Sequence, residues 1–331
     1  MVIARRAGGL AVAAAALLLV FLLSVWVGSK QIPFTAVWSV LWHDDGSSDA
    51  AIIHELRIPR AFLAVLVGAA LGLAGALMQG VTRNPLADPG LLGVNVGAAA
   101  AVALAIAYAG VTSVIGYVWF AFLGAAVVSV LVYLIGSAGR AATPERLVLA
   151  GAAVSAALGA VTYAVLLLDP EAFNQFRYWV VGSLAGRRED TLVRVAPFIA
   201  AGIVLALLLA RPLNALALGD DAGRALGAHA GRTRVLGAVA VTLLCGAATA
   251  AAGPIGFVGL AVPHVARMIV GPDQRWVLPY SMVLAPVLLL GADVVGRVVI
   301  APAELQAGVV TAFVGAPVFI ALCRRRKLAR L

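Results

Sequence analysis

Residues 61–80 read AFLAVLVGAALGLAGALMQG, a run of twenty residues without a charge. A helix of this length rises about 30 Å, which is the thickness of the hydrocarbon core of a bilayer. Small residues recur four apart within residues 68–77 of the run, and this spacing lets helix backbones approach closely in lipid. The stretch therefore predicts a transmembrane helix that packs tightly against its neighbours.

The composition of the whole chain extends this prediction. Of 331 residues, 63% are hydrophobic and 12% are charged, whereas soluble domains are about 45–50% apolar and about 25% charged. Because a soluble core cannot bury that excess, the sequence favours an all-α, polytopic membrane protein. We interpret residues 1–331 as a single transmembrane domain.

About ten runs are apolar and long enough to cross a membrane. They are 9–28, 61–80, 92–109, 114–136, 147–168, 192–210, 233–252, 256–270, 277–296 and 305–323. A cleaved signal peptide is the alternative for the first run, which follows Arg5 and Arg6. Its apolar core exceeds a normal signal core and no small-residue cleavage site follows, so we expect a retained helix.

The placement of charge predicts the orientation. With an inner N-terminus and ten crossings, most of the 24 Lys and Arg residues fall in inner connections. Most of the 15 Asp and Glu residues then fall in outer connections, and this asymmetry follows the positive-inside rule. Both termini are therefore predicted to be cytoplasmic. The basic tail RRRKLAR (324–330) is expected to lie near anionic lipid, not to bind nucleic acid.

The longest inner connection contains ALALGDDAGRALGAHAGRTRVLG (215–237). Its Asp220 and Asp221 precede a small-residue stretch, a place that suits carboxylates at a helix N-terminus. A solvated loop is the plain alternative. The apolar residues Leu216, Leu218 and Leu226 argue against that loop, so we expect a surface that docks a cytoplasmic protein.

Several kinds of site are missing from the sequence. No acidic residue lies near the middle of a predicted span, where ion-coupled carriers usually place one. No G-x-x-x-x-G-K-[ST] phosphate loop occurs, and the two cysteines and four histidines show no metal-ligand spacing. We therefore expect no catalytic residues, no metal site and no cofactor in this chain. A secondary transporter or channel, and a membrane-anchored enzyme, remain the alternatives to a transporter driven from outside the chain.

Three stretches together resemble the FecCD family, the permease subunits of ATP-driven importers for iron–siderophores, haem and cobalamin. The first is LRIPRAFLAVLVGAALGLAGALMQGVTRNPLADPGLLGVNVGA (56–98), and the second is the inner segment preceded by RPLN (211–214). The third is GPIGFVGLAVPHVARMIVGPDQR (253–275), continued by LLLGADVVGRVVIAPAELQAGVVTAFVGAPVFIALCRRRK (288–327). The resemblance runs in consistent order from about residue 55 to residue 327.

This resemblance implies a type II ABC importer permease in a bacterial cell membrane. Two permease subunits, identical or related, would surround a central pathway between their fifth and tenth helices. ATP-binding cassette ATPase subunits would bind beneath them, and an extracytoplasmic substrate-binding protein above. The cargo would be a metal chelate, with ferric siderophore as the general expectation, although haem and cobalamin permeases share these motifs.

The resemblance also implies roles for individual residues. Residues 215–234 would form the coupling segment that sits in a cleft of the ATPase, and the matching motif positions are Asp220, Arg224, Leu226 and Gly227. On the outer face, arginines would pair with glutamates of the binding protein, and the matching positions are Arg57, Arg60 and Arg297. Headgroup contact is the alternative for these arginines. The inner gate would lie at Thr143 and Pro144.

Overall fold

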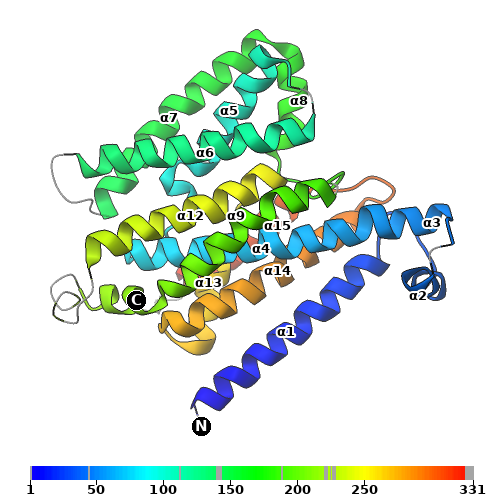
Figure 1. The fold of residues 1–331 in the computed structure, drawn as a ribbon, viewed down its shortest axis with the longest axis horizontal. Helices are drawn as coiled ribbons and strands as arrows, with labels where there is room; N and C mark the ends of the chain where they lie inside the picture. The colour runs from blue at the N-terminus through cyan, green and yellow to red at the C-terminus, as the bar shows by residue number, and fades with distance from the viewer. Residues whose placement is uncertain are drawn as a thin grey trace.

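The computed structural model describes residues 2–43, 45–111, 113–138, 144–187, 189–219, 223, 225 and 229–324. Within these ranges every regular element is a helix, as Figure 1 shows. The described part of the chain therefore confirms the predicted all-α architecture.

Among the described residues, seven helices are long and apolar enough to span a membrane, and three further apolar helices are shorter. The ten helices are α1 (Val2–Trp26), α4 (Ile58–Thr82), α5 (Val94–Ala109), α6 (Val114–Ser137), α7 (Pro144–Leu168), α9 (Glu189–Leu208), α12 (Ala230–Ala252), α13 (Val258–Val270), α14 (Gln274–Val299) and α15 (Ala307–Arg324). Each corresponds to one predicted run. The predicted count of ten is approximate, because α5, α13 and α15 fall short of a full crossing by length.

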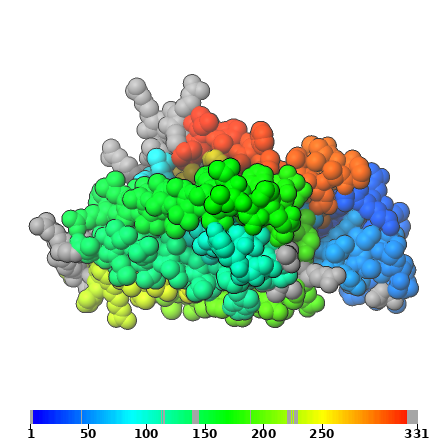
Figure 2. All heavy atoms as spheres, turned by 90° about the horizontal axis from the view of Figure 1, so that it is seen from above, coloured from blue at the N-terminus to red at the C-terminus, as the bar shows by residue number. Residues whose placement is uncertain are grey.

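Short helices lie in the connections between these spans. They are α2 (Phe34–Trp42), α3 (Ser48–Ala51), the π-helix η1 (Ile52–Arg57), the 3-10 helix η2 (Pro89–Leu92), α8 (Pro170–Val180) and α10 (Ala210–Ala217). Helices α2 and α3 project at one end of the molecule (Figure 1 and Figure 2). The sequence shows no interpretable motif in residues 41–55. In the structure this segment leads into α4.

Helix α4, the stretch that predicted the fold, lies at the centre of the bundle. It packs against α14, α12, α13 and α9, while α5, α6, α7 and α8 form a second group attached through α12 (Figure 1). Of the seven long helices it has the largest buried share. Helices α1 and α7 are mostly exposed and apolar, as expected of helices that face lipid or another apolar surface.

Glycines on α4 let two neighbouring helices, α13 and α14, approach its backbone. A Cβ atom at Gly68 would lie 2.6 Å from the Cα atom of Pro286 on α14. A Cβ atom at Gly75 would overlap the carbonyl oxygen of Gly259 on α13. Because lipid supplies no hydrophobic force between helices, such close contacts are a main source of their association. The small residues in the opening stretch therefore hold α4 against α13 and α14.

We predict that Gly75→Ala destabilises the fold and that Gly291→Ala does not. Gly291 lies inside α14, and a Cβ atom there would have no neighbour within 4 Å. Overpacking at Gly75 should cost about 1–3 kcal/mol, whereas alanine in a helix is favoured over glycine by roughly 0.5–1 kcal/mol. Thermal unfolding of the purified variants in detergent measures both. Equal stability of Gly75→Ala and the unaltered chain would contradict the close-packing argument.

Candidate functional site

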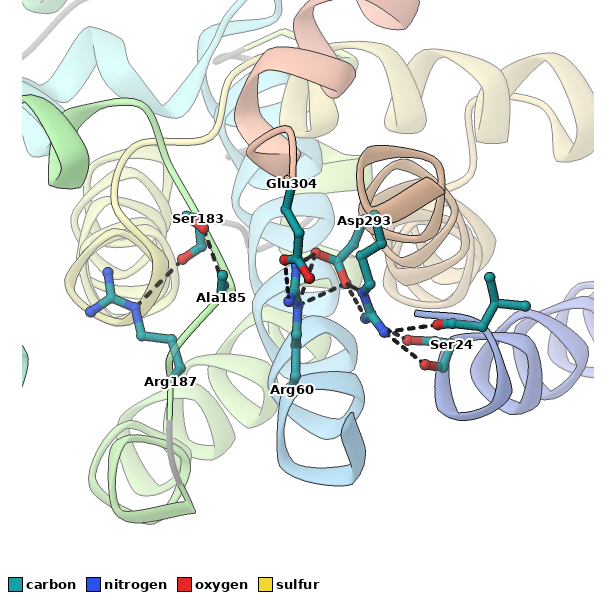
Figure 3. Close-up of polar contacts among 9 residues, drawn as sticks. Ser24, Arg60, Ser183, Ala185, Arg187, Asp293 and Glu304 are labelled. Atoms are coloured by element: carbon teal, nitrogen blue, oxygen red, sulfur yellow. Dashed lines mark hydrogen bonds and ion pairs between the residues drawn. The ribbon is translucent and has the colours of Figure 1, made fainter. Parts of the chain in front are cut away.

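A cluster of charged side chains lies where the N-terminal end of α4 and the C-terminal end of α14 meet the loop before α15. The positive-inside rule predicts that this end of the bundle faces outward, so it is called the outer end here and the opposite end the inner end. Arg60 comes from the first turn of α4, Asp293 from α14, and Glu304 from the loop before α15 (Figure 3). Arg297 lies on α14, four residues after Asp293. Asp293 is fully buried, and its two oxygens accept hydrogen bonds from both arginines. The Arg60 Nη2 atom lies 2.7 Å from Asp293 Oδ1. The remaining terminal nitrogen, Nη1, lies 2.8 Å from Glu304 Oε2.

The charges of this cluster lie in ion pairs with charges of opposite sign. Asp293 is paired with Arg60 and with Arg297, which lies one helical turn away on the same helix. A buried carboxylate is costly unless it is paired and hydrogen-bonded, and here both conditions are met. The cluster thus joins α4, α14 and the loop before α15.

Arg57 and Arg297 together bind the C-terminal end of α1. Arg57 donates to the carbonyl oxygens of Val25 at 3.1 Å and Lys30 at 2.6 Å. Arg297 donates to the carbonyl oxygen of Ser24 at 2.8 Å and to its hydroxyl at 2.9 Å. The last carbonyls of a helix have no partner within it and carry the negative end of its dipole. Two guanidinium groups therefore satisfy this helix end and fix α1 to the bundle.

Gly28 explains how Arg57 reaches the end of α1. A Cβ atom at Gly28 would lie 2.5 Å from Arg57 Nη2. The GSK sequence at 28–30 is therefore part of the arginine's binding site, with a backbone carbonyl of Lys30 as acceptor.

The three predicted docking arginines are therefore brought together, but they differ in access. Arg57 is 5% exposed and Arg297 is 2% exposed, and both donate to acceptors within the chain. The Arg60 side chain is 11% exposed and that of Glu304 is 26% exposed. Docking at these positions stays a prediction. Of the three arginines, Arg60 is the most accessible in this structure.

An outer pocket of about 360 Å³ lies over the cluster. Its charged lining residues are Lys30, Arg57, Arg60, Arg187, Arg297 and Glu304. Basic groups outnumber the one acidic group in the lining, and Asp293 beneath is fully buried. The pocket therefore presents a positive surface, which favours carboxylate groups as ligands.

Arg187 is a buried arginine that the sequence reasoning missed. It lies between α8 and α9, and its Nε donates to the carbonyl oxygen of Ser183 at 3.5 Å (Figure 3). Burial lowers the pKa of Arg187 to about 10, so the group stays protonated at neutral pH. Its guanidinium points away from Arg60 and Glu304 (Figure 3). No sequence pattern marks it, because an arginine of the GRRED stretch (186–190) looks the same in sequence whether buried or exposed.

Most of the predicted inner residues lie outside the described ranges. Asp220, Arg224, Leu226, Gly227 and Thr143 are all in this group, and the predictions for them stay predictions. Pro144 begins α7, which agrees with its predicted place at the start of the fifth span.

Helix α10 leads into the inner segment, and it is hydrogen-bonded to the start of α14. Asn214 on α10 donates from Nδ2 to Asp273 Oδ1 at 2.7 Å. The Asn214 Oδ1 atom accepts from the backbone N–H of Gln274 at 2.8 Å. Asn214 belongs to the RPLN motif, but the motif does not say what its amide contacts.

A second buried polar contact joins α4 to α13 near the inner side. Arg267 donates from Nη2 to the side-chain oxygen of Gln79, whose Nε2 donates to the carbonyl oxygen of Leu260 at 3.1 Å. Within the described residues, Arg267 Nε and Nη1 have no hydrogen-bond partner. The described residues also contain no group of three or more His, Cys, Asp or Glu side chains placed to hold a metal ion.

We predict that Asp293→Asn strongly destabilises the protein. The change leaves Arg60 and Arg297 without their shared carboxylate, and breaking a buried ion pair in this way costs about 3–5 kcal/mol. Asp49→Asn is the matched control, because Asp49 pairs with the exposed Lys30 and such pairs contribute at most about 1 kcal/mol. Thermal unfolding in detergent compares the two. If both variants unfold at the same temperature, the buried cluster does not stabilise the fold.

The chain is similar to known proteins in both sequence and fold. It matches the FecCD transport family over residues 16–325. It is 48% identical to the ferric enterobactin transport system permease protein FepD of Escherichia coli (strain K12), across 92% of this chain and 91% of that protein. It is 37% identical to the hemin transport system permease protein HmuU of Yersinia pestis, across 92% and 91%.

A solved structure gives the same result for the fold. An inward-facing conformation of a metal-chelate type ABC transporter superposes with a TM-score of 0.85 and 28% identity, covering 96% of this chain and 98% of that one. The family match spans nearly the whole chain and confirms the resemblance seen in the sequence motifs. This multi-pass membrane protein belongs to the FecCD transport family.

Proposed function

We propose that this chain is the permease subunit of an ABC importer that moves a metal chelate, with ferric siderophore as the first candidate, into the bacterial cytoplasm. One observation carries the proposal: nearly the whole fold superposes on a metal-chelate type ABC transporter. Relatives named for ferric enterobactin, ferric citrate and hemin transport support the chelate class. Both termini are cytoplasmic in this proposal, as the positive-inside rule requires.

The driving energy comes from partner subunits. The sequence contains no phosphate loop, so ATP is hydrolysed by cassette ATPases that bind the inner segment at 215–234. Within that segment Asp220, Arg224, Leu226 and Gly227 make the docking contact. Helix α10, which leads into the segment, is firmly tied to α14, and this supports a mechanical role for the region.

A second permease subunit, either a copy of this chain or a related one, completes the pathway. Helices α7 and α15 expose large apolar side chains, among them Leu149, Tyr163 and Phe313. The pathway lies between the α7 and α15 helices of the two subunits, and the inner gate lies at Thr143 and Pro144, where α7 begins. Its apolar wall suits a bulky chelate that must be released again.

The binding protein docks on the outer face over the positive pocket. Arg60 makes the direct contact with a carboxylate of the partner, because it is the most accessible of the three arginines. Arg57 and Arg297 hold α1 and Asp293 beneath it, and they shape the surface on which the partner rests. Arginine suits this role because its planar guanidinium can bind a carboxylate through two hydrogen bonds.

The test of the function is uptake into proteoliposomes that contain this chain and its ATPase and binding-protein partners. Iron-loaded enterobactin, ferric citrate and hemin are offered in turn. Uptake of at least one should require ATP on the side of the membrane that corresponds to the cytoplasm. It should persist without an ion gradient. Uptake that ignores ATP but collapses with the ion gradient would instead establish a secondary transporter.

We predict opposite effects for two changes at the pocket. Arg60→Glu should weaken docking of the binding protein about tenfold or more, because it replaces attraction with repulsion. Glu304→Gln should strengthen docking, because Glu304 now occupies a terminal nitrogen of Arg60. Binding-protein affinity for the permease in nanodiscs measures both.

Asp49→Asn is the control for general charge. It removes one negative charge from the outer side but touches Lys30, not Arg60. If it strengthens docking as much as Glu304→Gln, the effect is long-range attraction, and direct competition by Glu304 is wrong.

A further inference from the structure

We propose that Asn214 is a positioning residue that transmits movement of the inner segment to α14 and so to the outer charge cluster. This inference rests on the proposed function, because it assigns Asn214 to coupling between the ATPase and the binding protein. Asn214 lies just before the predicted coupling segment, on helix α10. It is 59 residues from Asp273 in sequence, so the contact exists through the tertiary fold.

The chemistry of the contact requires an amide. Asn214 donates to the Asp273 carboxylate at 2.7 Å and accepts from the Gln274 backbone N–H at 2.8 Å. Aspartate lacks the donor and would repel Asp273, and alanine lacks both groups. Two bonds of opposite direction fix the amide orientation, so α10 and the start of α14 move together.

Asp273 makes the contact rigid on the α14 side. It is the N-cap of α14 and accepts from the Arg275 backbone N–H at 3.0 Å. Hydrogen bonding from the Arg275 side chain holds the pKa of Asp273 at about 2, so the group is ionised across the physiological range. A charged acceptor strengthens the bond from Asn214. The amide is therefore attached to the first turn of α14 itself.

Helix α14 connects this inner contact to the outer site. It is one continuous helix over Gln274–Val299, about 39 Å long at 1.5 Å per residue. Its inner end bears the Asp273 cap, and its outer part bears Asp293 and Arg297. Those two side chains hold Arg60 and the end of α1. A shift of α10 therefore acts on the helix that supports the proposed docking surface.

Three variants separate this role from simple stabilisation. Asn214→Asp places two carboxylates together and breaks the contact, and Asn214→Ala removes it. The double variant Asn214→Asp with Asp273→Asn again pairs one amide with one carboxylate, and asparagine remains a good N-cap. Arg211→Ala is the matched control on α10, because Arg211 is exposed. With the single variant Asp273→Asn added, a double-mutant cycle isolates the pairwise interaction.

The first measurement uses the chain alone in nanodiscs, without any partner. Hydrogen–deuterium exchange at residues 274–278 should rise about tenfold or more in Asn214→Asp and Asn214→Ala, the size expected for losing a hydrogen bond to a charged group. The double variant should return toward the exchange rate of the unaltered chain. Arg211→Ala should exchange at the same rate as the unaltered chain. Unchanged exchange in both single variants would overturn the proposed link.

The second measurement uses the complex with its ATPase subunit and loaded binding protein. The single variants should retain assembly and basal ATP hydrolysis but lose several-fold of the stimulation by the binding protein, and the double variant should regain it. Full stimulation in both single variants, or loss that the double variant does not restore, would overturn the coupling role. If the unaltered complex shows no ATP-driven uptake, the proposed function fails instead. The exchange measurement on the chain alone still tests the link between α10 and α14.

Discussion

The rest of the structure depends on the backbone contact between α4 and its neighbours. At Gly68 and Gly75 there is no room for a side chain, because α14 and α13 lie directly against α4. In lipid, helices gain little by burying apolar surface, so this close approach provides the association that a soluble core obtains from water. The same contact fixes the position of α4 relative to α14. Since α4 and α14 lie together along their length, Arg60 and Asp293 meet at the outer end.

Charged and polar side chains lie at both ends of the same bundle. There they bind one another and the backbone groups at helix ends that have no partner within the helix. At the outer end, Asp293 forms ion pairs with Arg60 and Arg297. Arg57 and Arg297 bind the carbonyls at the end of α1. On the inner side, Asn214 and Asp273 bind the start of α14 to α10. Helix α14 thus carries a polar contact at each end. The coupling proposed above uses α14 as the connection between these two contacts.

The sequence predicted the spans, the all-α class and the family, and the structure and comparisons confirmed these predictions. Spans are readable because hydrocarbon demands long uncharged runs, and the demand is local in sequence. The site was predicted only as a set of arginines. The α1 acceptors of Arg57 and Arg297 were not predictable, because a helix-end carbonyl leaves no mark on composition. The same holds for Asn214, whose partner lies 59 residues away.

By itself, then, the sequence determined which segments enter the membrane and to which family the chain belongs, because both depend on runs and motifs read along one dimension. The tertiary structure decided what the charged residues do. Arg57 and Arg297 bind the end of α1. Arg60 lies at the edge of the outer pocket beside Glu304. Arg187 is buried without a described carboxylate partner. An arginine's role follows from the acceptors within about 3 Å of its nitrogens, and only the packing of distant helices brings those acceptors there.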